Sequence, residues 1–170
     1  MKLILETRRL YLRQLTPEDT SNLALVLSDQ KSMKHYPHPF SNEEVKEWIE
    51  RNIKRYENDG FGLWAVVRKA DNQFLGDCGI TLQNIDGDIL PEIGFHIIQK
   101  FCNCGYATEA AEACKKYALE VLGYTSIYSY SEAGNHASQR VSSKIGMTKV
   151  KTFRKDGIEE VVYEYRRERE

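Results

Sequence analysis

Alternating apolar and polar positions predict most of the strands in this chain. In the stretch Leu3–Leu15, apolar Leu10 and Leu12 alternate with arginines, which is typical of a strand with one solvated face. Short Asp-Asn and Asp-Gly turns separate the next three stretches, so we expect these to pair as antiparallel neighbours. They cover Phe61–Lys69, Gln73–Leu82 and Leu90–Ile98.

Helical spacing of apolar residues predicts four helices. Thr16 and Pro17 supply an N-cap and a first-turn proline for the first helix, and Ser41 opens the second with the spacing of a capping box. The third helix has apolar residues at 107, 110, 111, 114, 117, 118 and 121. The fourth is led by Asn135 and ends near Lys144.

The order of these elements defines the expected topology. A strand at Ser126–Ser131 follows the third helix, and such a crossover makes it parallel to the strand that ends at Ile98. A hairpin of Met147–Arg154 and Ile158–Arg166 closes the chain. The expected fold class is therefore α/β (α+β), with a mixed, mostly antiparallel twisted sheet of about seven strands and helices on both faces. We expect residues 1–170 to form a single domain.

A small-residue turn precedes the third helix. The first amides of a helix have no intrahelical partner and the helix dipole is positive there, so a phosphate bound at Asn103–Thr108 needs no basic side chain. Gly105 would let the backbone approach such a phosphate closely. The alternative is that Gly105 only shapes an ordinary strand-to-helix turn.

A series of short phrases favours the phosphate site over an ordinary turn. They are Glu6–Leu10, Leu12–Arg13, Gly76–Gly79, Glu92–Phe95, Gly105–Ala110 and the block Asn135–Met147. Their order across almost the whole chain resembles the GNAT superfamily of acetyl-CoA-dependent N-acetyltransferases. The similarity is closer still to the Rim-type branch, the ribosomal-protein N-terminal acetyltransferases and their relatives.

The resemblance implies where acetyl-CoA binds. In the family, the fourth and fifth strands splay apart, and the pantetheine arm pairs with backbone of the fourth strand. An amide near Phe95 or Ile97 would also stabilise the oxyanion of the reaction, although Ile97 and Ile98 are equally good core residues. The implied cofactor contacts are Phe95, Ile97, Ile98, Asn103, Cys104, Gly105, Tyr106, Ala107, Thr108, Asn135 and Ser138. Asn135 is also an expected N-cap, and the two roles carry comparable weight.

The chain departs from the family pattern at two positions. Cys102 replaces the usual arginine or glutamine of the pyrophosphate turn, while Asn103 tolerates the left-handed conformation of a glycine often found there. Ser142 replaces the tyrosine that acts as general acid in many relatives, which leaves Ser138 or water for that role.

The helix dipole also predicts a lowered thiol pKa, and hence high reactivity, at Cys102 or Cys104.

A general base must take a proton from the acceptor amine. Glu92 is the first candidate, because strand parity sets it on one face with Gly94 and His96; His96 is the second. A lone strand glutamate is otherwise more often solvated or ion-paired. The acceptor would lie beside Glu92, with Tyr36 and Trp48 as further lining residues, although aromatic residues at such spacing are more often core.

Composition limits the kinds of partner and the location that we expect for this protein. The net charge of -1 and the interleaved charges give no footprint for nucleic acid, and no apolar run is long enough for a membrane span or a signal peptide. We therefore expect a cytoplasmic protein, monomeric or homodimeric. Four cysteines without a second pair at zinc spacing indicate free thiols, and the pair His35 and His38 lies in a proline-stiffened loop, so no metal is expected.

Two functions remain open from the sequence. The first is an N-acetyltransferase that moves an acetyl group from acetyl-CoA directly to a primary amine, without an acyl-enzyme. The acceptor would be a protein N-terminus or a small-molecule amine. The alternative is a CoA-binding regulatory module with little turnover, which Cys102 and Ser142 motivate.

Overall fold

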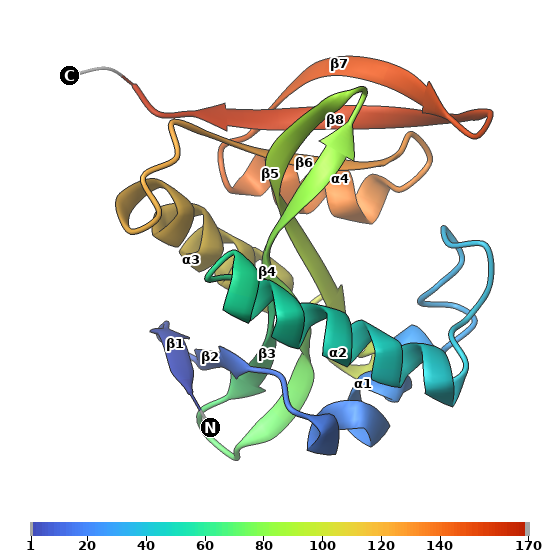
Figure 1. Ribbon diagram of the computed structural model, residues 1–170, viewed down its shortest axis with the longest axis vertical. Helices are drawn as coiled ribbons and strands as arrows, with labels where there is room; N and C mark the ends of the chain where they lie inside the picture. The colour runs from blue at the N-terminus through green and yellow to red at the C-terminus, as the bar shows by residue number, and fades with distance from the viewer. Residues whose placement is uncertain (1, 169–170) are drawn as a thin grey trace.

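The computed structural model describes residues 2–168, in which eight strands form one mixed sheet (Figure 1). The strands lie in the order β1-β2-β3-β4-β5-β6-β8-β7, and all neighbours are antiparallel except β5 and β6. The strands are β1 Leu3–Glu6, β2 Leu10–Gln14, β3 Leu63–Arg68, β4 Gln73–Ile85, β5 Asp88–Ile97, β6 Ser126–Glu132, β7 Thr148–Lys155 and β8 Ile158–Arg166. The parallel pair and the closing hairpin confirm the expected topology.

The expectation of one strand over Leu3–Leu15 was wrong. The chain turns back between β1 and β2, where the amide of Thr7 donates to the carbonyl of Leu10 and the Thr7 hydroxyl accepts from the amide of Leu10. This turn gives eight strands in place of seven. The polar run Glu6–Arg9 at the reversal contains no glycine, proline, asparagine or aspartate, so it lacks the usual residues that mark a turn.

The helices begin where their capping residues predict. Pro17–Asp19 form a 3-10 turn before α1 (Thr20–Leu27), and α2 (Asn42–Asn58) starts with the capping box of Ser41. A second 3-10 turn, Gln99–Phe101, links β5 to the turn before α3 (Tyr106–Glu120). Helix α4 spans His136–Lys144.

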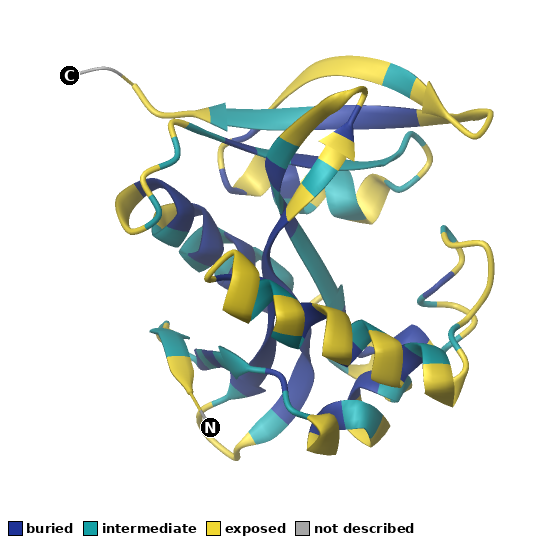
Figure 2. Cartoon of the chain, viewed as in Figure 1, coloured by how far each residue is buried: buried dark blue, intermediate teal, exposed yellow. Residues whose placement is uncertain are grey.

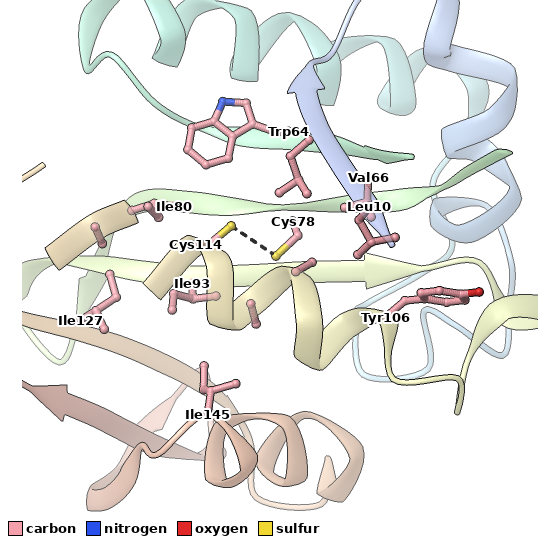
Figure 3. Close-up of a cluster of buried hydrophobic side chains, with 14 of the residues drawn as sticks. Leu10, Trp64, Val66, Cys78, Ile80, Ile93, Tyr106, Cys114, Ile127 and Ile145 are labelled. Carbon is pink, nitrogen blue, oxygen red and sulfur yellow. Dashed lines mark hydrogen bonds between the residues drawn. The ribbon is translucent and has the colours of Figure 1, made fainter. Parts of the chain in front are cut away.

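Side-chain parity on the central strands divides the core into two clusters. On β3, Trp64 and Val66 face the cluster under α3, while Ala65 and Val67 face the cluster under α1 and α2. Figure 2 shows the resulting buried centre, and Figure 3 shows the cluster under α3, where the thiols of Cys78 and Cys114 lie 3.7 Å apart. The sheet is therefore covered by helices on both faces, as expected.

The β5–β6 ladder is very short. Glu92 opposite Tyr128 is its single register pair within residues 2–168, whereas β5 pairs with β4 along the whole length of β5. The rest of β5, from Ile93 to Ile97, therefore has β4 on one side and no paired strand on the other. This unpaired edge leads directly into the turn before α3.

Candidate active site

The turn before α3 has the conformation that an anion site requires. Gly105 has φ of 83° and Asn103 has φ of 62°, so both lie in the left-handed region, as the sequence predicts. Helix α3 begins at the next residue, Tyr106, and its first amides have no intrahelical acceptor. A Cβ added at Gly105 would meet one group within 4 Å, the guanidinium Nη2 of Arg9 at 3.2 Å.

Arg9 places a positive charge beside this turn, in which Cys102 stands at the position of the usual arginine or glutamine. Its Nη1 donates to the carbonyl of Cys104 at 3.1 Å, and its guanidinium lies 4.4 Å from the centre of the Tyr106 ring. Its backbone amide and Nε both donate to the carboxylate of Glu109, at 3.0 and 2.7 Å. Sequence reasoning missed Arg9, although the phrase Glu6–Leu10 contains it.

Glu109 fixes this arrangement from the first turn of α3. Burial alone would raise the pKa of its carboxyl, but hydrogen bonds from the Thr7 hydroxyl and from Arg9 outweigh burial and lower the pKa. Glu109 is therefore ionised and neutralises part of the Arg9 charge. The remaining donors, the helix amides and the outer guanidinium nitrogens, suit an anionic ligand such as the pyrophosphate of acetyl-CoA.

The free edge of β5 offers backbone groups next to this turn. The amide of Ile98 donates to the carbonyl of Leu75 in the β4 direction, at 2.8 Å. Because successive amides of a strand point to opposite edges, those of Ile97 and Phe95 face the unpaired edge. Ile97 and Ile98 are also buried, so both side chains belong to the core, while the Ile97 amide stays available at the unpaired edge.

The fourth helix has its expected cap. The Asn135 side chain accepts from the amide of Ser138 at 3.2 Å, which confirms its structural use. Ser138 lies partly exposed on the first turn of α4, and its cofactor role stays a prediction. Ser142 is 2% exposed and shares a 2.6 Å hydrogen bond with Ser129 of β6, so it packs against the sheet.

Glu92 lies at the point where β5 and β6 part. Its carboxylate accepts from the backbone amide of Tyr130 at 3.1 Å, in the place where a longer parallel ladder would use a carbonyl of β5. Burial raises the pKa of Glu92 to about 8, against the opposing effect of the Tyr130 amide. A Cβ added at Gly94 would lie 3.9 Å from Glu92 Oε1. Glu92 and Gly94 therefore face the same side of β5, as expected.

Four side chains form a hydrogen-bonded chain on the same face of the sheet. Asp77 of β4, which is fully buried, accepts from Trp48 Nε1 of α2 at 3.0 Å and lies 2.7 Å from His96 Nδ1. The other ring nitrogen of His96 lies 2.6 Å from the hydroxyl of Tyr36. Sequence reasoning named Tyr36, Trp48 and His96 but missed Asp77, whose strand parity with His96 was the available signal.

The loop between α1 and α2 is anchored to both parted strands. Tyr36 reaches His96 on β5, and the neighbouring His35 pairs through Nδ1 with Glu132 on β6 at 2.8 Å. His38 pairs instead with Glu44 at the start of α2, so the two loop histidines have separate partners. The loop therefore spans the two strands on the face that carries Glu92.

The two turn cysteines differ in environment. Cys104 is exposed, whereas Cys102 is partly buried with its thiol 3.5 Å from the carbonyl of Ile97. Burial, with a smaller effect of Cys104, raises the pKa of Cys102, so the expectation of a lowered pKa was wrong for this residue. The charge of Lys31 opposes this effect but does not outweigh it. Cys78 and Cys114 are buried, as expected.

The described residues show neither a metal centre nor a membrane helix. Within residues 2–168, no group of three or more His, Cys, Asp or Glu side chains is arranged to hold a metal ion. In the same range, no helix is both long and apolar enough to cross a membrane.

The class of protein follows from a free strand edge that runs into a helix N-terminus, together with the comparisons. Comparison with known proteins agrees: residues 9–148 match the family described as "Acetyltransferase (GNAT) domain". The chain belongs to the GNAT family of N-acetyltransferases, which use acetyl-CoA and acetylate amines.

Similar proteins extend this assignment over the whole chain. The Bacillus subtilis protein YkkB is 34% identical over 161 residues, which cover 94% of each chain. A GNAT acetyltransferase from Bacillus anthracis superposes with a TM-score of 0.82 and 27% identity, over 96% of this chain and 98% of the other. RimL, a ribosomal L7/L12 acetyltransferase solved with coenzyme A, shares the fold with a TM-score of 0.80 and 16% identity, over 98% of each chain.

Proposed function

We propose that this protein transfers an acetyl group from acetyl-CoA directly to a primary amine. The observation that carries the proposal is the continuity of the β5 edge, the α3 turn and Glu92 along one path. The turn at Asn103–Thr108, with Arg9 beside it, holds the pyrophosphate, and the amides of Phe95 and Ile97 pair with the pantetheine arm. Asn135 and Ser138 border the same arm from the start of α4.

Acetyl-CoA supplies the acetyl group as an activated thioester. The protein contributes a base, and Glu92 is suited to that role because its pKa of about 8 lies near neutral pH. The amide of Phe95 or Ile97 donates to the carbonyl oxygen as negative charge develops on it. Neither Cys102 nor Cys104 has a hydrogen bond to a basic side chain within residues 2–168, so direct transfer is favoured over an acyl-enzyme.

The acceptor lies on the face that carries Glu92, Tyr36 and Trp48. The loop that holds Tyr36 bounds this face, and the RimL-like fold is compatible with a protein N-terminus as well as with a small amine. Ser142 is turned into the structure, so an acid for the departing thiol comes from Ser138, water or another group on this face.

Thiol release from acetyl-CoA with a panel of acceptors tests the proposal. The panel contains peptides with free N-termini, matched peptides with blocked N-termini, and small primary amines. The proposal predicts release that depends on a free amine and an acetylated product of matching mass. Tight binding of acetyl-CoA by calorimetry, without release for any acceptor, would instead favour the regulatory module.

A further inference from the structure

The cluster of Asp77, His96 and Tyr36 has the geometry of a proton relay. Asp77 is fully buried, and its oxygens contact Trp48 Nε1 and His96 Nδ1, so an accepting Asp77 oxygen orients His96 with the proton on Nδ1. The second ring nitrogen, Nε2, is then an acceptor for the Tyr36 hydroxyl, 2.6 Å away. Trp48 holds the other Asp77 oxygen, so the carboxylate cannot turn away from His96.

The relay ends on the same face as Glu92. On β5, His96 and Glu92 point to one side, and Gly94 between them carries no side chain. Burial raises the pKa of the Tyr36 hydroxyl, and the nearby charges of Asp77 and Glu92 raise it further. Tyr36 is nevertheless 38% exposed, so the rest of its ring borders solvent where an acceptor would arrive. The phenol is thus protonated at rest, bonded to a base and accessible.

The proposed reaction includes two proton transfers from the amine. A primary amine arrives as an ammonium ion at neutral pH and must lose one proton before it attacks and a second before it becomes an amide. Glu92 can accept only one of these at a time. The two nearby systems, Glu92 and the Tyr36–His96 pair, match the two protons in number and place.

We propose that Tyr36 is a second catalytic residue, and that His96 and Asp77 position it and store its proton. This proposal rests on the proposed function. Glu92 takes the first ammonium proton and passes it to solvent. As the amine nitrogen bonds to the acetyl carbon, Tyr36 accepts the second proton while its own hydroxyl proton moves to His96 Nε2. The imidazolium is stabilised by Asp77; the C–S bond breaks, and the stored proton returns through Tyr36 to the thiolate.

The Tyr36→Phe variant tests the catalytic part. Phenylalanine keeps the ring and its edge contact with Phe40 but cannot relay a proton. We expect kcat to fall by about 10- to 100-fold, with KM changed less than about threefold, because the lost group acts in the chemical step. Tyr11→Phe is the matched control, since the Tyr11 hydroxyl bonds Asn72, in the turn between β3 and β4, and it should retain wild-type kcat.

Nitrogen-15 NMR of His96 in the protein without substrate tests the positioning part independently of activity. We expect a neutral ring protonated at Nδ1, a shifted Nε2 resonance in Tyr36→Phe, and loss of the Nδ1 preference in Asp77→Asn. An Nε2-protonated ring or an imidazolium at assay pH would overturn the relay, as would wild-type kcat in a folded Tyr36→Phe protein. A wild type that acetylates no amine would contradict the proposed function instead.

Discussion

Glu92 has its raised pKa because the protein encloses its carboxyl at the point where the parallel ladder ends. Glu92→Gln keeps the shape and the bond to the Tyr130 amide but removes the base. We expect kcat/KM to fall by roughly 10² to 10⁴, and least at high pH, where free amine is abundant. Thiol-release kinetics from pH 6 to 9 measure this, with exposed Glu43→Gln as control. A loss below about threefold throughout would retire Glu92 as the base.

Glu92→Gln should lower activity but raise the stability of the folded protein. The folded-state pKa of Glu92, about 8, lies above the ordinary value of 4.5, so the folded protein keeps a proton that the unfolded chain loses in this window. Glu92 therefore lowers stability progressively as pH rises from 4.5 to about 8. Thermal unfolding should show a higher Tm for Glu92→Gln at pH 8 and little difference at pH 4.5. Equal Tm values at pH 8 would show that Glu92 ionises freely in the folded protein.

The exposure of Cys104 makes it the first thiol to react. Cys78 and Cys114 are buried, and burial raises the pKa of Cys102. We expect iodoacetamide to modify Cys104 first, and acetyl-CoA to slow this modification because it covers the turn. Mass spectrometry of digested protein measures both, with Cys104→Ser as control. Equal labelling of all four cysteines, or no protection, would contradict the assignment.

At the scale of elements, capping residues and turn residues predicted most boundaries. Ser41 and Asn135 cap α2 and α4 as expected, and the parallel β5–β6 pair followed from the crossover rule. The turn at Thr7 was missed because Glu6–Arg9 contain no glycine, proline, asparagine or aspartate to mark a reversal. Spacing rules describe local geometry. They located the elements, but they did not separate the two short strands β1 and β2.

The site was predictable where its residues share an element and less so where they do not. Strand parity placed Glu92 and His96 on one face, and the helical spacing of the residues that follow Gly105 placed its turn at a helix N-terminus. Arg9 reaches Glu109 across 100 positions of sequence, and Asp77 meets side chains from two other elements. Such contacts depend on how elements pack, which no local pattern records.

The α3 turn carries the next prediction. Gly105→Val places a β-branched residue at φ of 83° and brings its Cβ within 3.2 Å of the Arg9 guanidinium, so it should weaken acetyl-CoA binding by on the order of 10-fold or more. Gly123→Val is the matched control, because Gly123 has φ of 78° beyond the other end of α3, with nothing within 4 Å of its Cβ. Calorimetric titration compares the two. Unchanged affinity in folded Gly105→Val would place the pyrophosphate elsewhere.

At the scale of the molecule, the outer edge of the sheet is protected by charge. Strand β7 is exposed along nearly its whole length, as Figure 2 shows, and it carries Lys149, Lys151, Arg154 and Lys155. Charged side chains, lysine above all, discourage pairing with a second sheet. The internal edge of β5 differs from this outer edge, because we expect a ligand and not a second sheet to pair with it.

Hydrogen exchange tests that use of the internal edge. Saturating acetyl-CoA should slow exchange of the Phe95 and Ile97 amides, because they gain hydrogen-bond acceptors. The neighbouring Ile98 amide is the internal control, since it already donates to Leu75 and should change less. Protection spread evenly over all three amides would indicate general stabilisation without strand-like pairing.

The most direct measurement of the central claim is a crystal structure of the protein with coenzyme A. The account predicts the pyrophosphate on the amides of Asn103–Thr108 beside Arg9, the pantetheine arm paired with Phe95 and Ile97, and the thiol directed toward the face of Glu92. A coenzyme bound away from the α3 turn, or an arm that leaves the β5 edge unpaired, would contradict it.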